Sequence, residues 1–526
     1  MISRLSRTQT SRRHLLRTAS LAALGSLVKP LRAVATPSKP RFYDYPFKLG
    51  VASGDPMANG FVLWTRLAPD PFDRHAQAMP AVEVRWEVAS DEAMQSTVRS
   101  GTTLAHPERV HAVHVEVDGL EPDRQYFYRF ISGDEVSAVG RARTSPLPTS
   151  DVDQVRLAVT SCHSITDAYF PALRDLAEQA PRMVVHVGDY FYESEWIGGI
   201  RRIPIPEAYS LADYRELHAR YKLDPQLQAA HAACPWMFIW DDHEVVDNWG
   251  GAYNQQGLSP EQFAARKLAA FQAYYEHLPL RLSSRLRAEQ MRIYQRAFVG
   301  TLMELNLLDC RQYRNDPPCL EQVEAGPRYL PQCEAARAPE LSLLGEAQEI
   351  WLSRGLGRSG ARWNVIVQNT QVAPFDYVSG EDVGYDLDDW NSFDASRKRL
   401  LELLTRHRPT NPIFLGGNIH AYYAGLVHTD PFDPTTEPLA RELVATSLSA
   451  GGGGEDRYQH VNQQFEENPF ARYFDNRHRG YLLCDVTPEE WVTQCRVVAD
   501  VLDPDSPGST LATLTMRSGE TEIEVS

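Results

Sequence analysis

Hydrophobic and polar residues alternate over short segments in the first part of the chain. "GFVLWTRL", "VEVRWEV", "VHAVHVEV" and "YFYRFISG" show this spacing, and Gly, Pro and Asp turns separate them. Successive side chains of a strand point to opposite faces of a sheet, so the pattern is typical of strands with one buried face. We therefore expect a small β-sandwich of the fibronectin or immunoglobulin type over residues 42–145, followed by a linker at 144–154.

The pattern changes after the linker. Fully apolar runs, among them "VRLAVTS", "RMVVHVGD", "PWMFIWDDHE" and "NPIFLGGNIH", alternate with helix-like segments such as 259–276 and 394–407. Such strands are buried on both faces, as in a parallel sheet covered by helices, which predicts an α/β fold for residues 155–526. The glycine-rich "SLSAGGGGED" near residue 450 is expected to be a turn and not a phosphate-binding loop, because no clear helix start follows it.

Residues 1–35 have the pattern of an export signal. Twin arginines in "SRRHLLR" precede the apolar stretch "LAALGSLV", and Ala33-Val34-Ala35 offers small residues at the spacing that a signal peptidase cleaves. We expect a twin-arginine signal peptide, export by the twin-arginine machinery, and a periplasmic or extracellular protein; an ordinary basic leader or a frayed amphipathic helix is the alternative. No later apolar stretch reaches ~18 residues, so no integral membrane association is expected.

Charge narrows the functional classes. The 526 residues carry a formal net charge of −16, which disfavours binding to nucleic-acid backbones, so no nucleic-acid recognition is expected. An acidic enzyme that handles phosphate needs local positive charge. Metal ions can supply it.

The seven cysteines suit an oxidising compartment, where some would pair. Cys319 and Cys333 flank a loop with Pro and Gly and are candidate partners. Cys484 and Cys495 lie at mirrored positions about the turn "TPEE", so a hairpin disulfide is a second candidate. Free buried thiols are the alternative for both pairs.

Side chains that can bind metal follow four of the apolar strands. They are Cys162 and His163 in "VTSCHS", Asp189 and Tyr192 in "VGDYFY", Asp241, Asp242 and His243 in "IWDDHE", and Asn418 and His420 in "GGNIHAYY". Ligands of open α/β sheets gather at the carboxyl ends of the strands. Each residue alone has an ordinary structural explanation, as a buried thiol, a turn former or a packed ring. Their joint placement at strand ends favours one common site.

The donor atoms indicate two kinds of cation. A Cys162 thiolate, a Tyr192 phenolate and a His420 imidazole suit a transition metal, and the phenolate suits ferric iron. Asp189 has two oxygens and can bridge this ion to a second one ~3.5–4 Å away. Asp242 and Asn418 offer oxygen to a harder cation such as calcium, and His243, next to a ligand, is placed to donate a proton to a leaving alkoxide.

Longer motifs resemble the alkaline phosphatase D (PhoD) family of metallophosphoesterases. They are "GVASGDP", "GFVLWTRL", "SCHS", "VGDYFYE", "IWDDHEVVDN", "LDCRQYRNDPPC", "LGEAQEIWL" and "GGNIHA", and they extend from about residue 45 to about residue 480. The resemblance implies an N-terminal β-sandwich followed by a four-layer α/β/β/α catalytic domain. It also implies hydrolysis of phosphomonoesters and phosphodiesters with ferric iron (Fe3+) and calcium (Ca2+).

The resemblance also assigns residues. It implies an iron site with Asp189 as the bridge, formed by Cys162, Asp189, Tyr192 and His420. Asp242 and Asn418 then face the divalent ion or ions, and Asn248 is a weaker candidate for contacting metal or phosphate. Asn418 departs from the aspartate common in the family, so weaker cation binding is expected at the second position.

Two arginines and a cysteine near residue 310 are the remaining residues to be interpreted. Arg311 and Arg314 could clamp substrate or brace their loop, and bracing is favoured because loop arginines are commonly structural. Cys310 stands where the family is expected to have threonine, and we interpret it as packing.

We therefore expect in-line attack on phosphorus by a metal-bound hydroxide, with His243 protonating the departing oxygen. The substrates would be small-molecule or lipid phosphate esters. A phospholipase D-like phosphodiesterase of the same chemistry is one alternative, because the choice between mono- and diester depends on pocket width. A non-catalytic extracellular binding protein, with the metals as a structural staple, is the other.

Overall fold

The computed structural model describes residues 40–73, 79–194, 201, 203–287, 290–318, 329–378 and 380–526. The signal peptide expected at residues 1–35 lies outside these ranges and stays a prediction. Within the ranges, no helix combines the length and the apolar character that crossing a membrane requires.

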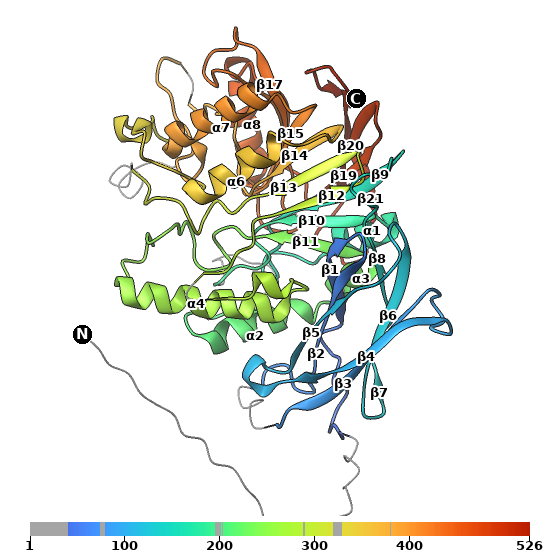
Figure 1. Cartoon of the computed structure of the whole chain (residues 1–526). Helices are drawn as coiled ribbons and strands as arrows, with labels where there is room; N and C mark the ends of the chain where they lie inside the picture. Colours follow the sequence, from blue (N-terminus) through green and yellow to red (C-terminus); the bar gives the residue numbers. More distant parts are fainter. Residues whose placement is uncertain are drawn as a thin grey trace, which may run out of the picture. The chain divides into compact units, whose positions relative to one another are not determined.

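Two large sheets organise the described residues (Figure 1). The first has the strand order β22 (Glu524–Val525), β21 (Gly508–Arg517), β20 (Glu490–Val498), β19 (Gly480–Val486), β9 (Val155–Thr160), β10 (Met183–Val187), β11 (Pro235–Ile239), β1 (Val51–Met57), β2 (Gly60–Arg66) and β5 (Ala112–Val117). The second has the order β12 (Gln295–Val299), β13 (Met303–Leu307), β14 (Trp363–Val367), β15 (Pro412–Gly416), β17 (Pro438–Val444), β16 (Tyr422–His428) and β18 (Ala471–Asp475).

Helices cover the outer faces of the two sheets. Residues of both sheets and of a first group of helices form one continuous hydrophobic core. This group comprises α1 (Pro171–Gln179), α2 (Leu211–Lys222), α3 (Pro225–Ala233) and α4 (Pro260–His277). The other face of the second sheet packs on α6 (Glu346–Leu356) and α7 (Asp394–His407). This layer order is the expected α/β/β/α arrangement, and the helices expected at 259–276 and 394–407 are confirmed as α4 and α7.

Short helical segments complete the described elements. They are α8 (Gly454–Gln464) and the 3-10 turns η2 (Pro107–Arg109), η3 (Leu282–Ser284), η4 (Glu334–Arg337), η5 (Trp390–Phe393) and η6 (Phe465–Glu467). The presence of α8 corrects one expectation, because a helix does begin directly after the glycines near residue 450.

Parallel pairing brings the carboxyl ends of the central strands to one edge. Val185 of β10 pairs in parallel with Val159 of β9 and with Met237 of β11, and β13, β14, β15 and β17 are parallel in the second sheet. β10, β11 and β14 are buried at every position, which explains their unbroken apolar sequences.

A third, smaller sheet lies in the N-terminal segment. It comprises β4 (Thr97–Ala105), β3 (Val82–Ala89), β6 (Gln125–Ser132) and β7 (Glu135–Val136), with β8 (Gly140–Arg143) also paired to β6. Phe61 and Leu63 of β2 share a core with Tyr128 and Phe130 of β6. The N-terminal strands therefore form two layers with apolar residues between them.

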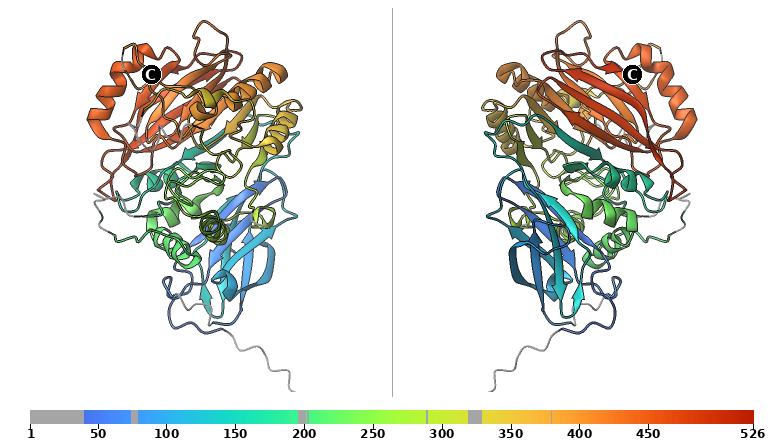
Figure 2. Two further views of the ribbon diagram at one scale, coloured as in Figure 1. Left: turned by 90° about the vertical axis from the view of Figure 1, so that its left-hand side faces the viewer. Right: turned by 90° about the vertical axis from the view of Figure 1, so that its right-hand side faces the viewer.

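One of these layers continues the first large sheet. Ser53 and Gly54 of β1 pair in parallel with Pro235 and Trp236 of β11. A Cβ atom on Gly54 would lie 2.5 Å from the carbonyl oxygen of Pro279 and 2.8 Å from that of Trp236, so only glycine fits this approach. Figure 2 shows the blue N-terminal strands beside the green helices, and α3 and α4 contact β1 and β2. The domain boundary between 42–145 and 155–526 stays a prediction, because Pro40–Ser526 forms one compact unit.

The cysteines divide into a bonded and a free group. Cys333 is disulfide-bonded, and its expected partner, Cys319, lies outside the described residues. Cys484 and Cys495 are free and buried. Across β19 and β20 Cys484 pairs with Thr493 while Cys495 pairs with Leu482, so this register keeps the thiols out of directly opposed positions and the hairpin disulfide is wrong.

Lys222 at the end of α2 is a buried base to which no carboxylate of the described residues is bonded. Its Nζ donates to the Tyr190 hydroxyl at 3.3 Å and lies 4.3 Å from the centre of the Trp64 ring. Burial lowers the pKa of Lys222 from 10.5 to about 7. Between these values the unfolded chain binds a proton that the folded chain does not, so stability falls as the pH decreases towards 7.

Lys222→Met should therefore stabilise the protein, and more at pH 6 than at pH 9.5. The gain in the free energy of unfolding is expected to differ by on the order of 3 kcal/mol between the two pH values. Urea unfolding followed by tryptophan fluorescence measures both. Lys398→Met on the exposed face of α7 is the control and should show no such pH dependence. An equal effect of Lys222→Met at both pH values would contradict the argument.

Candidate metal centre

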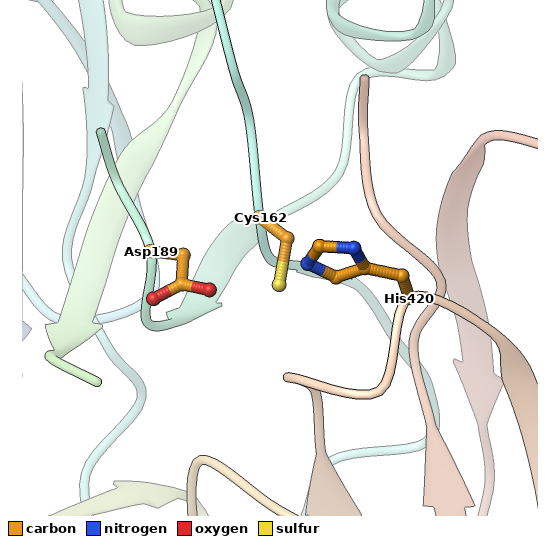
Figure 3. A group of neighbouring side chains, drawn as sticks. All are labelled: Cys162, Asp189 and His420. Atoms are coloured by element: carbon orange, nitrogen blue, oxygen red, sulfur yellow. The ribbon is translucent and has the colours of Figure 1, made fainter. Parts of the chain in front are cut away.

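The expected ligands lie on loops at the carboxyl ends of strands from both large sheets. Cys162 follows β9, Asp189 follows β10, Asp242 follows β11, and His420 follows β15 of the second sheet. In Figure 3 the side chains of Cys162, Asp189 and His420 point towards one another. The two sheets thus contribute to one site.

The backbone is left-handed at three of these four expected ligands and at two asparagines of the site. Positive φ angles occur at Cys162 (56°), Asp189 (55°), Asn248 (57°), Asn418 (67°) and His420 (52°). L residues adopt this region at an energetic cost, and such residues cluster at functional sites. The turn is fixed by contacts between the loops, since the Cys162 amide donates to the carbonyl oxygen of Gly188 at 3.1 Å.

Asp189 belongs to two groups of potential ligands. Its carboxylate lies with the Cys162 thiol and the His420 imidazole in one group, and with Asp242 and His243 in the other, each with ligand atoms within 4.8 Å of one another. The Tyr192 hydroxyl joins the first group, at 2.8 Å from His420 Nε2 and 3.3 Å from Asp189 Oδ2. One carboxylate is therefore positioned to serve two cations.

Several features of the first group fit a bound transition metal. His420 Nδ1 donates to the carbonyl oxygen of Gly451 at 2.6 Å, which directs Nε2 to the site as a potential ligand. Asp189 Oδ1 is buried and, within the described part of the chain, has no hydrogen-bond partner. Thiolate, phenolate, imidazole and carboxylate form a donor set suited to iron.

The electrostatics of this group indicate missing positive charge. Burial, reinforced by the neighbouring acids, raises the pKa values of Cys162, Asp189 and Tyr192 well above their ordinary values. Desolvation lowers the pKa of His420 to about 3. A cation reverses the first effect, because it stabilises the deprotonated ligands.

The second group offers oxygen atoms. Asp242 Oδ2 accepts from the Asn248 amide at 2.7 Å, whereas the buried Oδ1 accepts no hydrogen bond from the described residues and lies 3.4 Å from Arg311 Nη2. Asn418 and Asn248 line the same cavity as Asp242. Carboxylate and amide oxygens are the donors that calcium prefers, so this side of Asp189 fits a hard cation.

His243 is held as a charged imidazole at the edge of the site. Its Nδ1 lies 2.7 Å from Glu193 Oε2, and its ring centre is 4.2 Å from that of Tyr192. Burial opposes the charge, but Glu193, Asp242 and Asp189 outweigh it and raise the pKa of His243 well above 6.5. The contact with Glu193 leaves the other ring nitrogen of His243, Nε2, on the opposite side of the ring, 3.8 Å from Asp247 Oδ1.

Two glutamates that the sequence analysis did not single out support these residues. Glu193 orients His243, and its other oxygen accepts from the Asp247 amide at 2.9 Å. Glu244 accepts from the amides of Asp189 (3.1 Å) and Tyr190 (2.7 Å), and thereby ties the turn after β10 to the loop after β11. Both glutamates lie within the motifs "VGDYFYE" and "IWDDHE". The sequence signal for each supporting residue was therefore an acidic residue close to an expected ligand.

Arg311 and Arg314 lie beneath the site. The Arg311 guanidinium donates to Asp241 Oδ1 at 2.5 Å and to Asp388 Oδ2 at 2.7 Å, and Arg314 donates to Asp388 Oδ1 at 2.8 Å. Both side chains are buried, and neither lines the cavity. Asp241 therefore accepts from an arginine, and the same guanidinium lies 3.4 Å from Oδ1 of its neighbour Asp242. Cys310 packs in the core of the second sheet.

A cavity of about 610 Å³ opens over the two groups. Its described wall includes Asp189, Tyr192, Asp242, His243, Asn248, Asn418 and His420. Of the sequence-predicted site residues, Cys162 lies beneath this wall in contact with Tyr192, and Arg311 lies behind Asp241. The structure thus brings the expected metal ligands, His243 and Asn248 to one cavity.

Comparison with known proteins places this site in a family. The model of the PhoD-like phosphatase family matches residues 157–495, and that of its N-terminal domain matches residues 33–146. Alkaline phosphatase D of Bacillus subtilis (strain 168) is 39% identical over 504 residues, which cover 95% of this chain and 85% of that protein. Purple acid phosphatase 23 of Arabidopsis thaliana is 36% identical over 92 residues, or 16% of this chain and 20% of that protein.

A solved structure agrees with the sequence comparisons. The structure of PhoD superposes with a TM-score of 0.86 at 39% identity and covers 92% of this chain and 94% of that chain. Both the match over most of the chain and the arrangement of the strand-end ligands lead to one conclusion: the chain is an enzyme that belongs to the PhoD-like phosphatase family.

Proposed function

We propose that the protein hydrolyses phosphate esters at a site with Fe3+ on one side of Asp189 and Ca2+ on the other. The observation that carries the proposal is the Asp189 carboxylate, which belongs to both groups of potential ligands. The iron ligands are Cys162, Asp189, Tyr192 and His420, and the calcium ligands are Asp189, Asp242 and Asn418, with Asn248 next to them. When bound, the cations supply a water of lowered pKa and neutralise charge on the phosphoryl oxygens.

Protein groups position the leaving group's proton donor. His243 lines the cavity, and Glu193 holds its Nδ1, so Nε2 is the atom that gives a proton to the departing oxygen. Glu193 also stabilises the charged imidazole before the transfer, because a buried carboxylate at 2.7 Å favours the protonated ring. The Glu193–His243 pair is the general acid of this proposal.

The arginines below the site brace it. Arg311 joins Asp241 after β11 to the loop that contains Asp388, and Arg314 joins that loop to the carbonyl oxygen of Asn248. Both guanidinium groups are buried away from the described wall of the cavity, so the substrate contact considered for Arg311 is not part of the proposal. Asn248 is the contact to metal or phosphate.

The proposal extends to substrates and compartment. Small-molecule or lipid phosphate esters fit a cavity of about 610 Å³, and the relatives named as phosphatases support this class. The twin arginines near the start of the chain support export to the periplasm or the exterior by the twin-arginine machinery.

Replacement of the shared carboxylate tests the proposal. Asp189→Asn keeps the shape of the side chain but removes the charge that both cations need. We expect protein purified with iron and calcium to lose metal and to lose more than about 100-fold in hydrolysis of p-nitrophenyl phosphate, beyond the range for outer partners of a metal site. Elemental analysis and steady-state kinetics measure both.

Asp167→Asn is the matched control for this substitution. Asp167 lines the same cavity but belongs to neither ligand group, and its Oδ2 accepts from the Gly451 amide at 3.1 Å. It should keep both metals and most of the activity. Full activity in Asp189→Asn, or wild-type protein that turns over no phosphate ester when loaded with both metals, would rule the proposal out.

His243→Asn tests the proton donor. A good leaving group such as p-nitrophenolate departs without a proton, whereas glycerol does not. The variant should therefore lose on the order of 10²–10⁴-fold in kcat on glycerol phosphate and much less on p-nitrophenyl phosphate, with metal content unchanged. Equal losses on both substrates would show that His243 has another role.

A further inference from the structure

The described wall of the cavity is strongly acidic, and Arg457 is the only arginine or lysine on it. Asp167, Asp247, Asp386 and Asp388 surround the ligands, while Arg457 lies on the side formed by Gly451, Gly453 and His420. Arg311 and Arg314 are buried behind this wall and bonded to carboxylates. Apart from His243, positive charge thus reaches the described wall of the cavity from Arg457.

The start of α8 directs Arg457 to the cavity. Arg457 lies in the first turns of the helix, where long side chains point back towards the N-terminus. Its stem packs on Gly453, where a Cβ atom would lie 2.8 Å from Arg457 Cδ. Gly453 also has a φ of 80°, which glycine adopts without strain. The glycine-rich segment therefore lets the side chain turn along the backbone.

The Arg457 guanidinium lies close to the expected ligands. Nη1 donates to the carbonyl oxygen of Ile419 at 3.1 Å, between Asn418 and His420. Nε is buried and has no hydrogen-bond partner among the described residues. Because the Arg457 side chain lines the cavity, an anion bound there would be within reach of a charge-assisted hydrogen bond from the guanidinium.

From this placement we infer that Arg457 binds the phosphate oxygen that is free in a monoester and esterified in a diester, and so selects phosphomonoesters. The inference rests on the proposed function, in which the cations hold the oxygens that both substrate classes share. A monoester at alkaline pH has one more negative charge than a diester. A guanidinium is suited to this charge because its planar donors can bind two phosphate oxygens at once.

Two substrates separate this role from a structural one. Metal-loaded wild type and Arg457→Gln are compared on p-nitrophenyl phosphate and on bis-p-nitrophenyl phosphate. Loss of one charged hydrogen-bond partner should lower kcat/KM for the monoester about 10- to 100-fold, and kcat/KM for the diester less than about threefold. Arg457→Lys should restore part of the monoester rate, because it returns the charge without the planar fork.

Arg477→Gln is the matched control. Arg477 packs its guanidinium 3.7 Å from the Tyr458 ring centre on the same helix and bonds Asp475, but it does not line the cavity. It should leave the ratio of the two kcat/KM values unchanged. Binding of inorganic phosphate and of dimethyl phosphate, measured by calorimetry, provides a second readout, in which only phosphate should bind more weakly to Arg457→Gln.

The outcomes distinguish this inference from the proposed function. Equal losses on both substrates, or no loss on either, would overturn the role of Arg457 while the phosphoesterase activity stands. Wild-type protein that hydrolyses neither substrate after metal loading would instead overturn the proposed function itself.

Discussion

The site depends on the burial of several acids around one carboxylate without enough fixed positive charge beside them. Asp189 is 1% exposed and lies near Asp242 and the Cys162 thiol, and burial with repulsion from neighbouring acids makes the ionised forms of Asp189 and Cys162 unfavourable. On the inner side the protein itself compensates, since Arg311 contacts Asp241 and Asp388. Arg311 also lies 3.4 Å from Asp242 Oδ1, and together with His243 it outweighs burial and lowers the pKa of Asp242 to about 2. Asp189 and Cys162 have raised pKa values instead, so a bound cation would be needed to favour their ionised forms.

The fold creates this site by joining two sheets at their carboxyl edges. The carboxyl ends of parallel strands lie at the same edge of a sheet, so the residues that follow β9, β10, β11 and β15 lie close together at the site. Left-handed residues at those ends turn the chain sharply, and Glu244 ties two of the loops by accepting from the amides of Asp189 and Tyr190. The hydrophobic core between the sheets provides the energy that maintains such strained turns.

The sequence predicted what depends on residue type and strand position. Fully apolar strands indicated the buried sheets, and the residues that follow them, such as Asp189 and His420, indicated the ligands. It did not predict what depends on side-chain direction or register, such as the contact of Glu193 with His243 or the offset of Cys484 from Cys495. α8 was missed because Gly453 at its N-cap makes no side-chain capping hydrogen bond, so the usual start signal is absent.

Asn418 would change the balance of charge at the proposed second cation. An amide oxygen holds a hard cation less tightly than a carboxylate but neutralises none of its charge. Asp388, which lines the same cavity, does not replace the negative charge that an aspartate at position 418 would carry, because its two oxygens are bonded to Arg311 and Arg314. A cation next to Asn418 therefore retains more positive charge towards the cavity, which strengthens its attraction for a phosphate dianion. An amide oxygen in place of a carboxylate oxygen would therefore have two consequences. The cation would be held less tightly, and it would attract an anionic substrate more strongly.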